Sequence, residues 1–275
     1  MPATDDTAMN APVTAPRPAE RVLETTQLVK SFGGLVAVSK VDFHADENEI
    51  VGLIGPNGAG KTTLFNAITG VYSPTSGSIR FRDQDIAGML PSKVTKLGIA
   101  RTFQNIRLFN EMTTLENVMV GQHCRAHSSM LSIIARTPGA KRSEKAVRDK
   151  SMELIEYVGL SGHAAELSKN LPYGSQRRLE IARALATEPT VLFLDEPAAG
   201  MNPQETMELA QLLQELRQKH ALTIFLIEHD MKFVMRVCER IKVLDYGISI
   251  AEGTPTEIQN NPEVIKAYLG EKKHA

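Results

Sequence analysis

One segment of the chain, residues 55–62, matches the phosphate-binding pattern G-x-x-x-x-G-K-[ST] at every fixed position. Glycines let such a loop curl so that successive backbone N–H groups point at one anion. The lysine reaches the β- and γ-phosphates, and the hydroxyl binds Mg²⁺. A glycine-rich turn that happens to precede a helix is the alternative. The pattern predicts a nucleotide-binding site composed of Gly55, Pro56, Asn57, Gly58, Ala59, Gly60, Lys61, Thr62 and Thr63.

Two adjacent carboxylates follow an apolar segment much later in the chain. Residues 191–194 predict a buried strand that ends at Asp195, and Glu196 comes next. Ligands of α/β proteins collect at the carboxyl ends of strands, so we expect Asp195 to bind Mg²⁺, directly or through water. Glu196 is then free to polarise the attacking water as a general base. The alternative is a strand that simply ends in a turn containing Asp-Glu.

Two further polar residues occupy comparable positions. Gln104 follows residues 98–103, where a helical region begins, and His229 lies just beyond the apolar strand predicted for residues 223–227. A neutral imidazole at that point can hydrogen-bond a γ-phosphate oxygen and so sense whether the terminal phosphate is present. Taken alone, Gln104 fits a surface amide and His229 a structural histidine. Their order relative to the other motifs favours a place in the nucleotide site.

The elements that must position these residues alternate between two patterns. Short apolar or alternating segments near residues 22–29, 41–45, 50–54 and 78–82 predict strands, several of them antiparallel. The continuous apolar runs at 191–194 and 223–227 predict buried parallel strands. Residues 104–170 look helical, with a capping-box start at Thr113–Glu116. Between the two buried strands, Met207, Ala210, Leu213 and Leu216 predict one apolar helix face.

The composition is that of an ordinary globular protein, with 42% hydrophobic and 23% charged residues among 275. The net charge of −1 gives no electrostatic support for nucleic-acid binding. The two cysteines, Cys124 and Cys238, lack metal-ligand spacing and predict free thiols in a reducing cytoplasm. Residues 1–20 resemble a disordered leader and carry no signal-peptide pattern. The longest nearly apolar run, residues 221–227, is far too short to span a membrane, so we expect a protein that at most docks on one.

The order of the motifs resembles the ATP-binding-cassette ATPases over about residues 22–270. The resemblance implies an α/β fold: a P-loop NTPase core with a mostly parallel sheet, an antiparallel β subdomain and an inserted helical subdomain. The expected boundaries are one domain over 21–275, with a core formed by 21–103 and 171–275 and a helical insertion at 104–170. It also implies that Phe32 stacks on adenine. Gln104 would couple the γ-phosphate to the helical subdomain and join Thr62 and Asp195 at Mg²⁺.

The segment Leu171-Pro172-Tyr173-Gly174-Ser175 departs from the family's usual signature L-S-G-G-Q. In the family this loop starts a helix and closes on the ATP held by the other subunit. Proline has neither a hydroxyl nor an N–H, so the donor set is smaller here, although the helix start can still bind an anion. Asn202 also replaces the usual aspartate in the loop 199–202, which would reach across the dimer. We expect an asymmetric pair, in which the site completed by this chain's signature is the weaker one.

Finer resemblance lies in residues 101–109, 195–203, 227–231 and 267–270, which are similar to the LivG-type ATPase subunits of branched-chain amino-acid importers. This implies ATP and Mg²⁺ as cofactors and a location on the inner face of the membrane. The implied partners are a second ATPase of the LivF type (or a second copy of this chain), two transmembrane permeases and a periplasmic solute-binding protein. No partner is a nucleic acid. A urea, amide or other amino-acid importer, a lipopolysaccharide exporter and a soluble cassette protein remain as alternatives. No N-K-x-D motif supports a GTPase.

Overall fold

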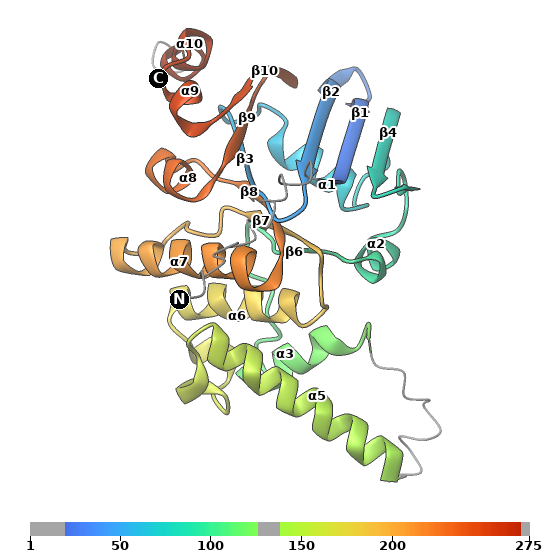
Figure 1. Ribbon diagram of the computed structural model, residues 1–275, viewed down its shortest axis with the longest axis vertical. Coiled ribbons are helices and arrows are strands. Elements are labelled where there is room, and N and C mark those ends of the chain that lie inside the picture. The colour runs from blue at the N-terminus through green and yellow to red at the C-terminus, as the bar shows by residue number, and fades with distance from the viewer. Residues whose placement is uncertain (1–19, 126–137, 271–275) are drawn as a thin grey trace, which may run out of the picture.

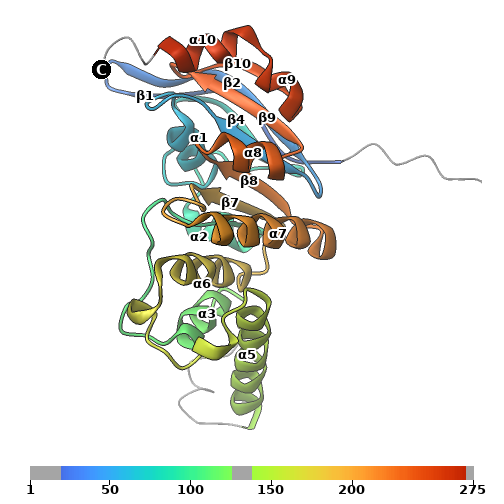
Figure 2. The ribbon, with the colours of Figure 1, turned by 90° about the vertical axis from the view of Figure 1, so that its left-hand side faces the viewer.

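The computed structural model describes residues 20–125 and 138–270, and the predicted leader 1–20 lies outside this part except for its last residue. The elements form three tiers, with an antiparallel sheet and the C-terminal helices at one end and a helical lobe at the other (Figures 1 and 2). Between them lies a mostly parallel sheet. The predicted fold class is confirmed. None of the helices in the described residues is long and apolar enough to cross a membrane.

The central sheet has six strands in the order β10-β9-β3-β8-β7-β6. Its parallel pairs are β9 with β3, β3 with β8, β8 with β7, and β7 with β6, while β10 runs antiparallel to β9. Parallel strands covered on both faces are continuously apolar, which explains the fully buried runs of β3, β7 and β8. The bounds are β3 Ile50–Ile54, β6 Ile99–Arg101, β7 Val191–Asp195, β8 Thr223–Ile227, β9 Arg240–Asp245 and β10 Ile248–Gly253.

A second sheet is antiparallel, in the order β2-β1-β4-β5. Its strands are β1 Arg21–Phe32, β2 Leu35–Asp46, β4 Ser76–Phe81 and β5 Gln84–Asp85. Its inner face packs on the central sheet and on α1 (Lys61–Ile68) through one large apolar cluster. Within this cluster the Phe193 and Phe225 rings stack at 4.6 Å, and Phe43 and Phe65 extend the row on either side. The Phe43–Phe225 contact joins the two sheets, and the Phe65–Phe193 contact joins α1 to the central sheet.

Helices cover the other face of the central sheet in a second apolar cluster. On α7 the buried positions are Leu209, Ala210, Leu213 and Leu216, whereas Met207 is 49% exposed. The prediction was therefore wrong at Met207, because the buried stripe runs through Leu209 instead. The covering helices are α6 Tyr173–Leu185, α7 Pro203–His220, α8 Met231–Val237, α9 Pro255–Gln259 and α10 Pro262–Gly270.

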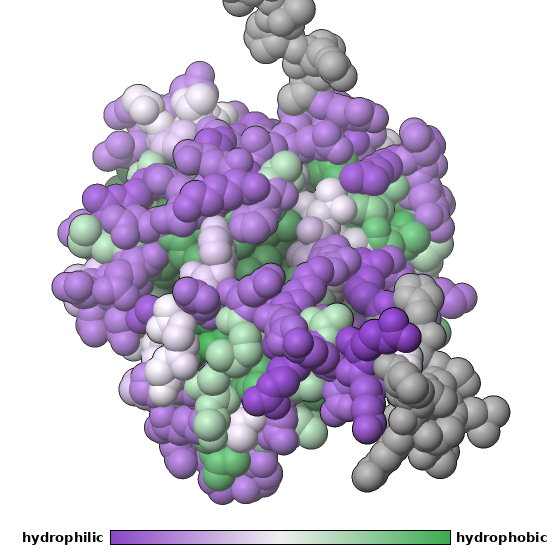
Figure 3. Space-filling view, turned by 60° about the horizontal axis from the view of Figure 1, so that its bottom comes forward, coloured by the Kyte–Doolittle hydropathy of each residue, from purple (hydrophilic) through white to green (hydrophobic). Residues whose placement is uncertain are grey.

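The helical lobe has its own apolar cluster, which joins α3, α5 and α6. The capping box predicted at Thr113 is present, with Glu116 bonded back to the Thr113 backbone. Seen from this end, the surface is mostly hydrophilic with separate apolar patches (Figure 3). The lobe and the connection from the antiparallel sheet contain α2 Pro91–Leu97, α3 Thr114–Gln122, α5 Pro138–Tyr157 and the short helices Ser161–His163 and Ser168–Asn170.

Candidate functional site

The predicted site residues other than Phe32 converge because parallel strands end at one edge of the sheet. The phosphate loop 55–60 follows β3, and Asp195 ends β7. His229 comes two residues after β8, and Gln104 three residues after β6. This edge is where open α/β sheets bind their ligands. The structure thus brings together four segments that the sequence separates by up to 174 positions, counted from 55 to 229.

The phosphate loop adopts a backbone that only glycine accommodates easily. Gly55 has φ 149°, and a Cβ there would lie 2.0 Å from the Leu244 carbonyl oxygen. Gly60 has φ 95° and forms the N-cap of α1, with no side chain capping the helix. The first N–H groups of α1 therefore receive no side-chain cap. A helix start of this kind can bind a phosphate group through its backbone N–H groups.

Lys61 lies folded back over the loop. Its Nζ donates hydrogen bonds to the Gly55 carbonyl at 2.6 Å and to the Pro56 carbonyl at 2.8 Å. An ammonium held by two loop carbonyls adds positive charge at the point where the backbone N–H groups gather. The Lys61 ammonium and the loop N–H groups together are suited to binding a polyphosphate.

Asp195 provides the strongest indication of a cation. Its side chain is 2% exposed, and Oδ1 has no hydrogen-bond partner among the described residues. Burial raises the pKa of the Asp195 carboxyl above its usual range, while the Arg101 guanidinium opposes this shift. A buried carboxylate oxygen without a partner is costly unless an ion or water binds it. Together with the exposed hydroxyl-bearing residue Thr62, which lines the same groove, Asp195 presents the oxygen ligands that Mg²⁺ prefers.

Glu196 is the residue around which the predicted polar groups gather. Its φ is 48°, a left-handed conformation that is strained for a non-glycine residue and typical of functional sites. Its backbone N–H donates to the Ile227 carbonyl at 2.9 Å. The Gln104 amide donates to Oε2 at 3.3 Å, and His229 Nδ1 lies 3.8 Å from the same oxygen. Glu196, Gln104 and His229 are thus close enough to act on one reacting group.

Phe32 lies apart from this edge, on the antiparallel sheet. Its ring is 43% exposed and meets the Tyr72 ring edge-on at 5.2 Å between centroids. The Lys30 ammonium lies 4.8 Å from the Phe32 centroid. A half-exposed aromatic ring braced in this way offers a face for a planar base. The adenine platform stays a prediction.

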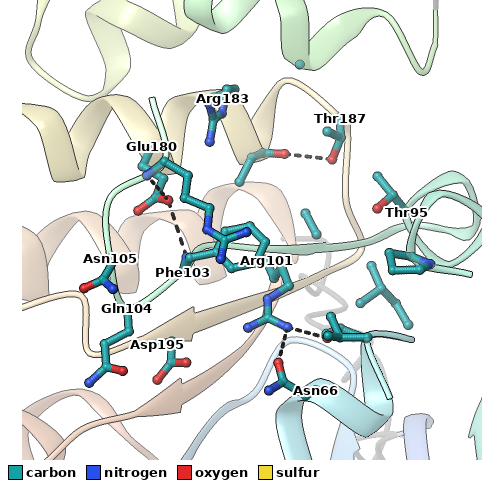
Figure 4. A pocket seen from close by; sticks show the side chains of 18 of the residues that line it. Asn66, Thr95, Arg101, Phe103, Gln104, Asn105, Glu180, Arg183, Thr187 and Asp195 are labelled. Atoms are coloured by element: carbon teal, nitrogen blue, oxygen red, sulfur yellow. Dashed lines mark hydrogen bonds between the residues drawn. The ribbon is translucent and has the colours of Figure 1, made fainter. Parts of the chain in front are cut away.

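A groove of about 860 Å³ leads from Asp195 and Thr62 toward the helical lobe. Figure 4 shows Gln104 and Asp195 close together at one end, with Arg101 bonded to Asn66 farther along and Arg183 on α6 above. The Arg101 and Arg107 guanidiniums lie 4.5 and 4.4 Å from the centroid of the Phe103 ring. The groove therefore presents both positive charge and aromatic surface.

Several residues at the site were not identified from the sequence. Arg177 and Glu180, both buried on α6, contact the backbone of the Gln104 segment. Glu228 is 1% exposed and accepts from the Ala198 N–H at 2.9 Å, which fixes the loop after Glu196. The available signal for Arg177 and Glu180 was that two charged residues occupy positions on the buried face of α6, which is otherwise lined by glycine and apolar residues. For Glu228 the signal was its place between a buried strand and His229.

Two family matches cover different parts of the chain. Residues 38–199 match the family described as ABC transporter, and residues 250–274 match the one described as branched-chain amino acid ATP-binding cassette transporter. The high-affinity branched-chain amino acid transport ATP-binding protein LivG of Escherichia coli (strain K12) is 49% identical, over 92% of this chain and 99% of that protein. The lipopolysaccharide export system ATP-binding protein LptB of Haemophilus influenzae is 34% identical, over 91% of this chain and 98% of that protein.

Solved structures share the fold. The ADP conformation of MJ1267, an ATP-binding cassette of an ABC transporter, superposes with a TM-score of 0.80 and 32% identity, over 91% of this chain and 99% of that one. The dimeric cassette MJ0796 bound to ADP and Pi gives a TM-score of 0.73 at 25% identity, over 85% of this chain and 98% of that one.

Proposed function

Since this chain belongs to the ATP-binding cassette family of ABC transporters, we propose that it energises a bacterial importer of branched-chain amino acids. It is an ATPase, and the ATP-binding half-site is the one formed by the phosphate loop and the carboxyl edge of the central sheet. The observation that carries the substrate class is the 49% identity to LivG over 92% of the chain. The C-terminal match over residues 250–274 supports the same class.

Each site residue has a proposed part in hydrolysis. Lys61 and the loop N–H groups bind the phosphates, and Glu196 accepts a proton from the attacking water. Gln104 and His229 orient the groups around Glu196 and contact the γ-phosphate. Mg²⁺, held by Thr62, Asp195 and Gln104, would neutralise phosphate charge during the transfer.

The proposed partners follow from the ATP-binding half-site, which a second cassette must complete. A second cassette, of the LivF type or a copy of this chain, closes over the ATP, and MJ0796 is a solved example of a dimeric cassette. Two permeases complete the transporter, with a permease helix docked in this chain's groove between the central sheet and the helical lobe, and a periplasmic binding protein delivers the solute. The chain would then work on the cytoplasmic face of the membrane. The arginines and aromatic rings of the groove could bind an amphipathic permease helix that carries a carboxylate, with the arginines pairing with the carboxylate and the rings packing on the apolar face.

Solute uptake in a deletion strain tests the substrate class. Deleting the gene is expected to abolish high-affinity uptake of radiolabelled leucine, isoleucine and valine, and a plasmid copy should restore it. A tagged chain should co-purify from membranes with its permeases. Unchanged uptake of all three amino acids, with loss of urea or amide uptake, would reassign the solute. A lipopolysaccharide-transport defect would favour the export alternative, which the 34% identity to LptB supports less well.

The adenine platform can be tested at Phe32. Replacing Phe32 with alanine is expected to raise the KM for ATP about tenfold, because stacking of a base on an aromatic ring contributes roughly 1–3 kcal/mol. Steady-state hydrolysis at varied ATP measures the effect. Phe32→Trp is the matched control, since it keeps an aromatic face and should retain a nearly normal KM. An unchanged KM in the alanine variant would place the adenine elsewhere.

A further inference from the structure

Two buried charged residues on α6 hold a segment that lies more than seventy positions away in the sequence. Arg177 is 3% exposed and Glu180 is 2% exposed, and they pair at 3.4 Å. Burial raises the pKa of Glu180, although Arg177 opposes this shift. Arg177 Nε has no hydrogen-bond partner among the described residues. A buried ion pair of this kind is rarely more stable than apolar residues of the same volume, so stability alone does not explain it.

The contacts of the pair are to the backbone on both sides of Gln104. Arg177 Nη1 donates to the Phe103 carbonyl at 2.8 Å, and Nη2 donates to the Gln104 carbonyl. Glu180 Oε1 accepts from the N–H groups of Phe103 and Arg107, each at 3.4 Å. Four backbone groups of the segment 103–107 are therefore held from α6. The Gln104 side chain, projecting from the same segment, reaches Glu196 at 3.3 Å.

Tyr173 extends this set of contacts to the surface. Its hydroxyl accepts from Arg177 Nη2 at 3.0 Å. Its ring covers Gly200 so closely that a Cβ on Gly200 would lie 2.9 Å from Tyr173 Cε1. Tyr173 is still 46% exposed, on the first turn of α6 beside the loop 199–202. This face is the one that the proposed cassette dimer would cover.

We propose that Tyr173 and Arg177 are positioning residues for ATP hydrolysis, which connect the dimer-facing surface of this chain to its own Gln104–Glu196 pair. The inference rests on the proposed role of Glu196. Packing against Gly200 positions the Tyr173 ring. The Tyr173 hydroxyl then orients the Arg177 guanidinium, which in turn holds the Gln104 carbonyl in place. Movement of the 199–202 loop on dimer closure is thereby transmitted to the residue that touches the catalytic carboxylate. A tyrosine where the family signature has glycine gives this chain the hydroxyl that the connection needs.

Two conservative variants test the connection in the full complex that co-purifies with this chain. Tyr173→Phe keeps the ring on Gly200 and removes the hydroxyl. We expect its kcat to fall about fivefold, the effect of losing one net hydrogen bond. Arg177→Lys keeps the charge opposite Glu180 but cannot form the forked contacts, so kcat should fall about tenfold or more. The KM for ATP should stay within about twofold in both variants, because the contacts do not bind the nucleotide.

Matched controls separate positioning from folding. Arg178→Lys changes the neighbouring arginine, which pairs with Glu208 on another face, and Tyr157→Phe removes a hydroxyl that has no hydrogen-bond partner among the described residues. Both should keep normal kcat. Thermal unfolding of every variant shows whether the fold is intact. Should Arg177→Lys fail to fold, Tyr173→Phe carries the test by itself.

The outcomes distinguish this inference from the proposed function. Normal kcat in Tyr173→Phe and Arg177→Lys, with hydrolysis abolished in Glu196→Gln, overturns the connection and leaves the role of Glu196 standing. A fall in kcat that follows the loss of Tm across the variants also overturns it, because it indicates a structural role. Retained hydrolysis in Glu196→Gln would instead remove the base on which both rest. Lower kcat with unchanged KM and Tm supports the connection.

Discussion

Replacing Glu196 with glutamine is expected to lower ATP hydrolysis by roughly 10²–10⁴-fold while ATP binding stays intact, because a general base contributes about that factor. Glutamine has the same shape and still accepts a hydrogen bond from Gln104, which lies 3.3 Å from the carboxylate. It cannot take a proton from water at neutral pH. Phosphate release by the purified complex measures turnover, and equilibrium binding of ATP measures affinity.

A second glutamate supplies a matched control for Glu196. Glu188 also has a left-handed backbone, with φ 51°, but it lies on the surface and pairs with Lys150. Glu188→Gln should hydrolyse ATP normally. Hydrolysis that persists in Glu196→Gln at the wild-type rate would assign the base to another group.

The same substitution tests the expected asymmetry between the two sites of a cassette pair. The first turn of α6 begins at Pro172, which provides no side-chain cap, and Tyr173 lies where the family has glycine. We expect Glu196→Gln in this chain to remove most of the ATPase activity of the complex. The equivalent change in the partner cassette should remove less. Equal losses would contradict the asymmetry.

Replacing Lys61 with alanine is expected to weaken ATP binding at least about a hundredfold, since each hydrogen bond from a charged donor contributes roughly 1.5–3 kcal/mol. The Lys61 side chain donates to the carbonyls of Gly55 and Pro56, over the loop that we propose binds the phosphates. Transport and hydrolysis should both disappear.

Thermal unfolding with and without ATP checks this second prediction. At an ATP concentration of 100 times Kd, the native chain gains about 2.7 kcal/mol of stability from the ligand. The Lys61 variant should gain almost none. Lys219→Ala, which removes an exposed lysine paired with Glu215, is the control and should keep the full gain. A normal gain in the Lys61 variant would show that the lysine does not bind the phosphates.

The local structure around the predicted nucleotide site could be inferred from the sequence, because its main parts are local. The phosphate loop needs a strand, glycines at fixed turns and a helix start, and all of these lie within residues 50–68. Asp195 ends a strand whose apolar residues are contiguous and Glu196 comes next, so their place at a sheet edge could be inferred. The capping box at Thr113 was predictable for the same reason, since it depends on residues three apart.

The prediction was weakest where burial depends on neighbouring elements. On α7 the spacing favoured Met207 for the inward face, yet Leu209 is buried and Met207 is half exposed. Both positions fit an apolar stripe at helical spacing. The orientation of α7 on the central sheet decides between them, and that orientation is set by β7, β8 and α8.

The sequence by itself determined that this chain has a phosphate-loop pattern, two adjacent carboxylates at the end of a buried strand and the motif order of a cassette ATPase. Each of those features lies within a short run of residues whose types are dictated by their chemistry. Only the tertiary structure decided how Arg177 and Glu180 hold the backbone around Gln104, and how Tyr173 lies against Gly200. These contacts join side chains to backbone groups, which every residue carries. No sequence pattern therefore marks these contacts, which form only when folding brings α6 against the segment 103–107.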